Sequence, residues 1–307
     1  MSLVNITTNQ ILIMFIIILI GFICYKTDLI DKETNKKLSG ILLMLVNPIL
    51  IFESYIREFS TELLQGLLLS FGLAIATHVI GIIIAYVLLR GKEEKNVVIE
   101  RFSSIYSNCG FMGIPLINGI LGGEGVFYIT AYMTIFNVFV WTHGLTMMIG
   151  KQDKKATIKT LISPTIIAMI LGIIFFITRM TLPEVLLQSF RYISGLNTPL
   201  AMIIAGVTIA QTDIKKIFIK FRIYYVTAIK LLVIPIALLL LYSRFPIPKE
   251  VLLTAIVAAA CPTGATGTLF AIRYNKNALY ASEIFATTTL LSITTLPLVV
   301  ALIAMIS

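Results

Sequence analysis

YSNCGFMGIPL, residues 106–116, places an asparagine, a cysteine, two glycines and a proline inside a hydrophobic stretch of the chain. Proline lacks a backbone N–H and glycine adds backbone freedom, so the stretch predicts an interrupted helix. In a membrane, freed backbone groups are tolerated only where they are packed inside protein or line a wet cavity. If the chain spans a membrane, this stretch is a candidate functional site.

The composition of the 307-residue chain is that of an integral membrane protein. Hydrophobic residues make up 58% and charged residues 13%, with a mean hydropathy of +0.97, which is far from the composition of a water-soluble domain. Apolar runs of about 20 residues, enough to cross about 30 Å of hydrocarbon as a helix, recur along the chain. We predict ten spans, at residues 8–25, 38–56, 63–90, 97–121, 125–149, 158–178, 185–210, 221–243, 250–272 and 279–306. The start MSLVNITTNQ lacks the basic segment of a secretory signal, so we expect the first span to be kept.

Basic residues gather in alternate connections, which predicts the orientation, because lysine and arginine are retained in the cytoplasm. Most of the 24 lysines and arginines follow the odd-numbered spans. They are Lys26, Lys32, Lys36, Lys37, Arg90, Lys92, Lys95, Arg101, Lys151, Lys154, Lys155, Lys159, Lys215, Lys216, Lys220, Arg222, Arg273 and Lys276. We therefore expect a multi-pass protein of the cell membrane with both termini outside.

The net charge of +9 needs no nucleic acid to explain it, because these residues lie in short cytoplasmic loops beside anionic headgroups. The three cysteines lie in or next to spans and imply no disulfide framework. The two histidines are isolated, so we expect no metal site, and nothing suggests a cofactor.

Ten spans with a basic loop in the middle suggest two halves of five. Because five is odd, the second copy would be inverted, as in many secondary transporters. We predict a first repeat at 1–149, a cytoplasmic connecting loop at 150–157 and a second repeat at 158–307. Asn47-Pro48 in span 2 then answers Asn197-Thr198-Pro199 in span 7.

A second interruption lies in span 9, where CPTGATGTLFAIRYN, residues 261–275, answers the break in span 4. Paired breaks in two halves mark a binding site, and half-helices ending there direct positive N-terminal dipoles toward an anion. The alternative is a pair of ordinary kinks filled by neighbouring helices.

Several segments in the same order resemble the auxin efflux carrier family, which includes plant PIN carriers and bacterial permeases labelled as malate or malonate transporters. They are SNCGFMGIPLINGILGGEGVFY (107–128), NTPLAMIIAG (197–206), KLLVIP (230–235) and CPTGATGTLFAIRYN (261–275). The resemblance covers essentially the whole chain.

The resemblance implies an all-α fold of ten transmembrane helices in two inverted five-helix repeats, similar to bile-acid-type carriers and to NhaA. Spans 1, 2, 6 and 7 would form a scaffold, and spans 3–5 and 8–10 a moving transport domain, whose broken spans 4 and 9 cross at the substrate carboxylate. Plant carriers have Pro-Asn at the span 4 break, whereas this chain has Ser107-Asn108. We therefore expect the break to rely on Gly110, Gly113 and Pro115. In span 9, Gly267 stands at the second proline position of the plant pattern.

The predicted substrate site combines the residues of both breaks. It consists of Asn108, Cys109, Gly110, Pro262, Thr263, Gly264 and Thr266. The Asn108 amide suits either a carboxylate or a freed backbone group. Thr263, Thr266 and Thr268 could also bond to carbonyl oxygens one turn back, and a buried cysteine is usually a small hydrophobic residue.

Two deep ionisable residues are candidates for coupling. Lys230 is an intramembrane charge, for which we favour a structural or coupling role over substrate contact. His78, at roughly the equivalent place in the first repeat, is the candidate for proton coupling; the alternative is a neutral histidine bonded to a neighbour. We expect His143 to lie at the interface with Trp141.

Glu53 and Glu283 lie near span ends, where we expect solvent to reach them. Without a deep carboxylate, proton coupling or a uniport is favoured over sodium coupling. The chain carries none of the motifs of a membrane enzyme, so we predict no catalysis.

The predicted function is elevator-type secondary transport of small organic anions, mono- or dicarboxylates such as malate or malonate, with auxin-like acids included. The scaffold would stay fixed, with a homodimer as one arrangement. The alternative is a channel or sensor that uses the same fold without coupled transport.

Overall fold

The computed structural model describes residues 3–91, 94–150, 163–212 and 220–306, and these are helical apart from short connections and two helix breaks. The first half contains α1 (Leu3–Lys26), α2 (Lys32–Ile41), η1 (Leu42–Val46), α3 (Asn47–Ser54), α4 (Thr61–Leu88), α5 (Glu94–Ile105), η2 (Cys109–Gly113), α6 (Ile114–Phe139), η3 (Val140–Gly144) and α7 (Leu145–Ile149). The second half contains α9 (Pro164–Thr178), α10 (Glu184–Ser194), α11 (Asn197–Ala210), α13 (Phe221–Ala228), η4 (Ile229–Val233), α14 (Ile234–Tyr242), α15 (Lys249–Ala260), α16 (Thr266–Arg273) and α17 (Ala278–Ile306). The four η elements are single π-helical turns inside longer helices.

Local signals in the sequence set many helix ends. The Asp31, Ser60 and Ser163 side chains each accept a hydrogen bond from a backbone N–H of the first turn that follows, as N-cap residues do. Pro164 occupies the first turn of α9, where its missing N–H costs nothing, whereas Pro48, Pro115 and Pro235 each follow a π-helical turn inside a longer helix.

Seven helices in the described residues are long and apolar enough to cross a membrane. They cover seven of the ten predicted spans, with the stretch Cys109–Ile149 taking in the end of span 4 and all of span 5. Within it, Gly122 has φ +63 and reverses the helix at the predicted boundary between the two spans. Predicted span 9 is divided between α15 and α16, and α9 is a shorter apolar helix. Apart from Gly150, the predicted connecting loop 150–157 lies outside the described residues.

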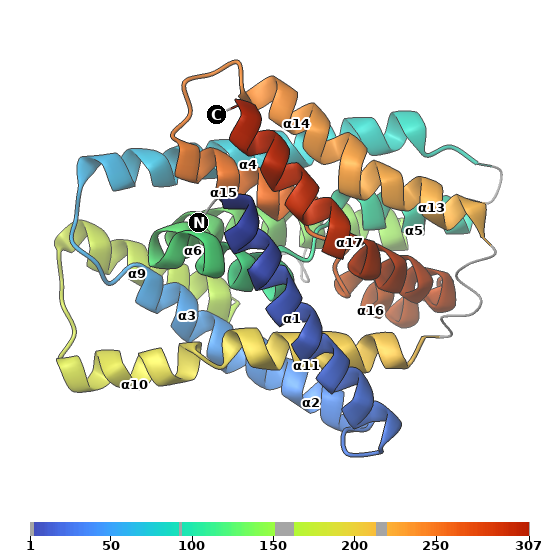
Figure 1. Cartoon of the computed structure of the whole chain (residues 1–307), viewed down its shortest axis with the longest axis horizontal. Coiled ribbons are helices and arrows are strands. Elements are labelled where there is room, and N and C mark those ends of the chain that lie inside the picture. Colours follow the sequence, from blue (N-terminus) through green and yellow to red (C-terminus); the bar gives the residue numbers. More distant parts are fainter. Residues whose placement is uncertain (1–2, 92–93, 151–162, 213–219, 307) are drawn as a thin grey trace.

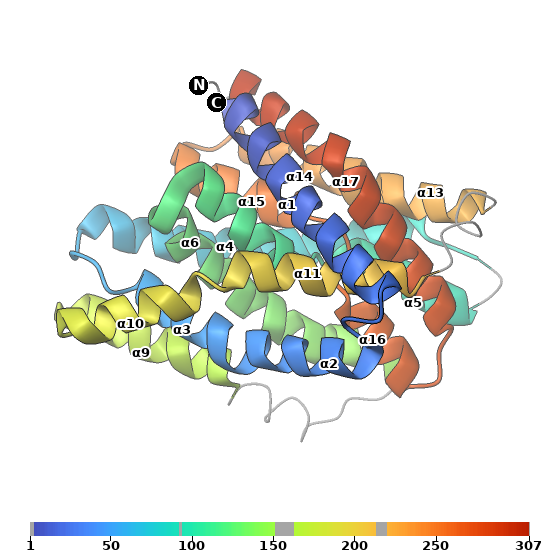
Figure 2. The ribbon, with the colours of Figure 1, turned by 60° about the horizontal axis from the view of Figure 1, so that its bottom comes forward.

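The helices pack as two groups, each of which we name after two of its helices. In the α1/α11 group, α1 and α2 pack on α11, and α3 packs on α9 and α10. In the α4/α17 group, α4 and α15 pack on α6, and α5, α15 and α16 pack on α17. Both views show α1 crossing α11, and Figure 2 shows the start of α1 and the end of α17 at the same end of the molecule. The two groups meet where α1 contacts α6 and α17, and where α11 contacts η2.

The backbones of α1 and α11 approach each other closely at two glycines. A Cβ added to Gly206 would lie 2.0 Å from the carbonyl oxygen of Ile18, and one added to Gly21 would lie 2.3 Å from that of Ile203. No side chain fits at either place, so this contact depends on glycine.

Polar side chains join elements across the middle of the chain. Asn197 Nδ2 donates to Asn47 Oδ1 at 2.7 Å, so two residues that the repeat pattern predicts to be equivalent contact each other. Between the two groups, Gln10 donates to the Pro115 carbonyl and Arg57 to the Gly123 carbonyl.

Candidate functional site

The two interrupted helices meet and complete each other's backbone hydrogen bonds. After α5 and α15 end, Ser107 and Thr263 form an antiparallel bridge. The Asn108 N–H donates to the Pro262 carbonyl at 2.7 Å, and the Gly264 N–H donates to the Tyr106 carbonyl at 3.0 Å. We call these two segments, 106–108 and 261–265, the crossing. Each break therefore supplies hydrogen-bond partners for backbone groups of the other break, which the hydrocarbon of a membrane could not supply.

The break in span 4 lies earlier than we expected from its glycines and proline. Gly110 and Gly113 belong to the π-helical turn η2, and Pro115 lies in the first turn of α6. The expectation that these three residues form the break was wrong, because each of them is accommodated inside a helix that begins after Asn108. Residues 106–108 instead lie between two helices and pair with residues 262–264.

Lys230 joins the two segments of the crossing. Its ammonium donates to Ser107 Oγ at 2.6 Å and to the Ala259 carbonyl at 3.0 Å, and the side chain is only 1% exposed. The Ala259 carbonyl belongs to the last turn of α15, where a cation interacts favourably with the helix dipole. Lys230 thus ties the break of α5 to the end of α15.

Asn108 buries an amide nitrogen that has no hydrogen-bond partner among the described residues. The residue is 6% exposed, and both its Nδ2 and the Thr263 hydroxyl are buried without a partner. Two helices begin beside these groups, one at Cys109 and one at Thr266. The first N–H groups of a helix have no partner within the helix, so an anion here would satisfy several donors at once.

The other predicted site residues lie in or directly beside the crossing. Pro262 and Gly264 are in it, whereas Cys109, Gly110 and Thr266 begin the helices that lead away. Cys109 and Cys261 are free thiols, fully buried. Thr268, by contrast, lies inside α16, where its hydroxyl is another buried oxygen without a partner.

His78 is buried in an aromatic cage on α4. Its Nδ1 hydrogen-bonds to the Ala74 carbonyl at 2.7 Å, its Nε2 has no partner, and its ring stacks on Phe139. The Nδ1 contact makes His78 a donor to its own helix. No hydrogen bond or ion pair joins His78 to Lys230 in the described part of the chain.

His143 was expected to lie beside Trp141 at the interface, but its hydrogen-bond partner lies elsewhere. Its Nδ1 is 2.8 Å from the hydroxyl of Tyr106, the residue directly before Ser107. Trp141 instead packs its ring against Phe270. The sequence gives no signal for the Tyr106 contact, because the two residues come from different helices.

The expectation that solvent reaches Glu283 was wrong. Its side chain is 0% exposed and pairs with Lys220 at 2.6 Å. Glu53 lies nearer the surface, bonded by the Ser194 hydroxyl and close to Arg191. The sequence analysis also missed Glu100, a second buried carboxylate.

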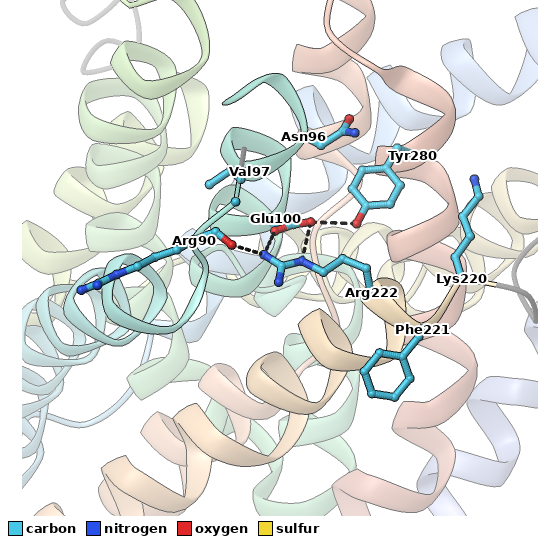
Figure 3. Close-up of a pocket in the computed structure, with 9 residues that line it drawn as sticks. Arg90, Asn96, Val97, Glu100, Lys220, Phe221, Arg222 and Tyr280 are labelled. Carbon is cyan, nitrogen blue, oxygen red and sulfur yellow. Dashed lines mark hydrogen bonds and ion pairs between the residues drawn. The ribbon is translucent and has the colours of Figure 1, made fainter. Parts of the chain in front are cut away.

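Glu100 lies at the wall of an open hollow of about 430 Å³ (Figure 3). Arg222 reaches it through Nε at 3.0 Å and Nη2 at 2.6 Å, and the Tyr280 hydroxyl donates to it at 2.9 Å. Figure 3 shows both side chains pointing at the carboxylate from α13 and α17. The network fastens α5, α13 and α17 together, at a place separate from the crossing.

In the described residues, no three histidine, cysteine or acidic side chains lie close enough together to bind one metal ion. The donors of the crossing are instead an amide, hydroxyls and an ammonium. Such groups suit a small molecule with oxygen acceptors.

Comparisons with known proteins find relatives that are named as transporters. An uncharacterized transporter of Methanocaldococcus jannaschii is 27% identical over 92% of this chain and 94% of its own length. One of Methanothermobacter thermautotrophicus is 23% identical over 95% of this chain and 97% of its own length. The uncharacterized transporter YfdV of Escherichia coli is 27% identical over 62% of each chain.

The family described as Membrane transport protein matches residues 6–158 and 152–300, which together span nearly the whole chain. Its relatives carry names of transporters and none of an enzyme. The resemblance to auxin efflux carriers is thereby confirmed, and the chain belongs to the Membrane transport protein family.

Proposed function

We propose that the protein is a secondary transporter of small organic anions, mono- or dicarboxylates such as malate or malonate, that are bound at the crossing. The observation that carries this proposal is the unpartnered Asn108 amide, buried between the starts of two helices. A buried donor left unpaired costs about 1–3 kcal/mol. A substrate carboxylate would remove that cost, and the nearby Lys230 ammonium would favour its charge.

The proposed fold is two inverted repeats of five spans, with repeats at 1–149 and 158–307. Reciprocal packing supports it. Span 1 packs on span 7 through α1 and α11, and span 6 packs on span 2 through α9 and α3. Likewise α15 of span 9 packs on α6 of span 5, and α5 of span 4 packs on α17 of span 10. An inverted repeat requires such exchanged pairs.

The proposed mechanism is an elevator. The α1/α11 group corresponds to the predicted scaffold of spans 1, 2, 6 and 7, and the α4/α17 group to the predicted transport domain of spans 3–5 and 8–10. The crossing and Lys230 belong to the second group, so substrate and site would move together. The two groups meet where α1 packs on α6 and α17, with polar contacts at Gln10 and Arg57, and packed helices can slide past one another by small shear movements.

The predictions about location, oligomeric state and coupling ion remain part of this proposal. They are a cell-membrane location with both termini outside, an arrangement as a homodimer, and coupling to protons rather than sodium. The location of both chain ends at one side of the molecule fits an even number of crossings (Figure 2).

The test is counterflow of labelled malate in proteoliposomes, with unlabelled carboxylates as competitors. We expect saturable exchange, and we expect Asn108→Ala to lower malate affinity about 10- to 100-fold, because a hydrogen bond to a charged group contributes about 1.5–3 kcal/mol. Asn118→Ala is the matched control, since Asn118 lies exposed on α6. Unchanged affinity in folded Asn108→Ala would remove the residue from the site, and no flux of any carboxylate would refute the substrate class.

A further inference from the structure

Both histidines of the chain lie against one tyrosine, and that tyrosine forms part of the crossing. The Tyr106 ring centroid lies 6.2 Å from that of His78 and 6.3 Å from that of His143. Of the two, His143 is the one bonded to the Tyr106 hydroxyl, and it is half-buried rather than fully enclosed. His143 is therefore the histidine that combines access with a contact to the crossing.

Tyr106 connects His143 to the crossing through one residue. Its hydroxyl is 2.8 Å from His143 Nδ1 and 3.0 Å from the Phe139 carbonyl. Its own backbone carbonyl accepts the Gly264 N–H at 3.0 Å, and its neighbours are Ser107 and then Asn108. A change at His143 is thus one side chain away from the backbone pairing that holds Asn108.

We propose that His143 is the proton-binding residue of the transporter and that Tyr106 links its charge to the substrate at the crossing. This inference rests on the proposed anion transport and supplies its coupling ion. It replaces His78, whose ring is enclosed by Tyr132, Phe136 and Phe139 and donates to its own helix.

Protonation fits the hydrogen bonds around the ring. A proton added to His143 makes both ring nitrogens donors. Nδ1–H then donates to the Tyr106 oxygen, and the single Tyr106 proton goes to the Phe139 carbonyl, so both contacts are made at once. In the neutral form with the proton on Nε2, Nδ1 competes with that carbonyl for the Tyr106 proton. The imidazolium, like the neutral tautomer with its proton on Nδ1, thus holds Tyr106 in the observed position, whereas the tautomer with its proton on Nε2 does not.

Neutral and basic groups surround His143 when no substrate is bound. The ionisable groups facing His143 are Tyr86 on α4 and Tyr106 after α5. Arg101 of α5 lies over the Tyr86 ring at 4.2 Å, and Arg273 lies on α16, which packs on α7. His78 adds a further basic group on α4, and no carboxylate pairs with His143 among the described residues. Only a bound anion would then supply negative charge.

Proton and substrate would bind cooperatively as a result. A cationic His143 attracts the carboxylate at the crossing, and by linkage the carboxylate favours protonation by the same factor. One proton would enter with each bound anion and leave with it. The sign follows: anion affinity is high below the histidine pKa and falls as pH rises through it.

The test measures malate KM in proteoliposomes from about pH 6.5 to 8.5, around and above the ordinary histidine pKa of about 6.5, together with an internal pH-sensitive dye. We expect the wild-type KM to rise about tenfold over this range and malate uptake to acidify the lumen. His143→Gln and Tyr106→Phe should each give a flat KM profile, with malate flux that carries no proton. Tyr86→Phe is the matched control, because Tyr86 touches His143 by its ring alone.

Each of the following results would contradict the inference. A His143→Gln protein that keeps the wild-type pH profile excludes His143 as the proton site, and a Tyr106→Phe protein that keeps it excludes the link. Equal loss of flux at every pH in both variants would assign them a structural role. Malate flux without any pH dependence in the wild type would refute the coupling and leave the anion transporter intact, whereas absence of malate flux would refute both.

Discussion

The contact between α1 and α11 and the crossing are built on opposite principles. The helix contact is apolar and depends on two glycines, Gly21 and Gly206, that bring backbone against backbone. The crossing is polar, held by main-chain pairs and by Lys230, and it leaves the Asn108 amide without a partner. In the part of the chain that the structure describes, the α1–α11 contact is made by glycine backbone, whereas the crossing contains a buried donor without a partner.

This difference implies that the α1–α11 contact stabilises the fold, whereas the crossing is suited to binding a ligand. Close helix packing contributes dispersion and has little to gain from a ligand. Unpartnered buried donors cost stability and recover it only when a ligand arrives. Variants in the first region should therefore change folding, and variants in the second should change affinity.

The largest effect is expected at Gly206. Gly206→Leu would force atoms into the Ile18 backbone, where a Cβ alone would lie 2.0 Å from the carbonyl oxygen. Backbone cannot rotate away as a side chain can, so we expect a loss of about 3 kcal/mol or more, or no folded protein. Thermal unfolding in detergent and the yield of monodisperse protein measure this.

The matched control for Gly206→Leu is Gly81→Ala. Gly81 is also a buried helical glycine, but a Cβ there would meet nothing within 4 Å. We expect unchanged or slightly raised stability, since alanine favours helix over glycine by about 1 kcal/mol. Equal damage by both substitutions would show that the α1–α11 contact has no special dependence on glycine.

A smaller effect is expected at the Asn47–Asn197 pair, a polar contact inside the apolar group. Asn197→Leu would leave the buried Asn47 oxygen without its donor, at a cost of about 1–3 kcal/mol. Replacing both residues by leucine also removes the Asn47 oxygen that Asn197→Leu leaves without its donor. We therefore expect the double variant to be more stable than Asn197→Leu. Denaturation of the two single variants and the double variant gives the interaction free energy between Asn47 and Asn197. Strictly additive losses of stability would show that the two side chains do not interact.

Lys230→Met is expected to change stability still less, within about 1 kcal/mol. The substitution removes two hydrogen bonds, and it also removes the cost of burying an ammonium without a carboxylate partner. Ser107 and the Ala259 carbonyl would keep their own 3.2 Å hydrogen bond.

Malate affinity should nevertheless fall about tenfold in Lys230→Met, since the cation beside the crossing is lost. Lys37→Met, on the exposed face of α2, is the control for removing a lysine. If Lys230→Met unfolded the protein while Gly206→Leu did not, the assignment of the two regions would be reversed.

The sequence predicts the features that are local in the chain. Apolar runs locate seven of the predicted spans, and proline and glycine indicate that spans 4 and 9 are interrupted, because each signal is contained in a few consecutive residues. The repeat pattern pairs Asn47 with Asn197, although it cannot reveal that they touch. Gly206 and Gly81 look alike in sequence, and only the packing of α1 distinguishes them.

Features that depend on distant partners could not be predicted. Glu283 is buried because Lys220 reaches it from another helix, so its place near a span end misleads. His143 lies beside Trp141 in the chain but bonds to Tyr106 across the fold. The position of the break also differs from the expected one, since residues 106–108 leave the helix where they pair with residues 262–264.

The smallest effect is expected outside both regions, at the N-cap of α2. Asp31 accepts the Thr34 N–H at 2.7 Å, and this hydrogen bond holds the pKa of its carboxyl below the ordinary value of 3.8. The folded pKa is depressed, so the stabilisation is present above the unfolded pKa and is lost as pH falls through the folded one. Asp31→Asn keeps the cap without the charge, and Asp31→Ala removes both. We expect Tm to fall slightly in Asp31→Ala at neutral pH and less in Asp31→Asn, with the difference between wild type and Asp31→Asn vanishing below the folded pKa. A difference between those two proteins that persists in acid would show that the Asp31 charge is not its source.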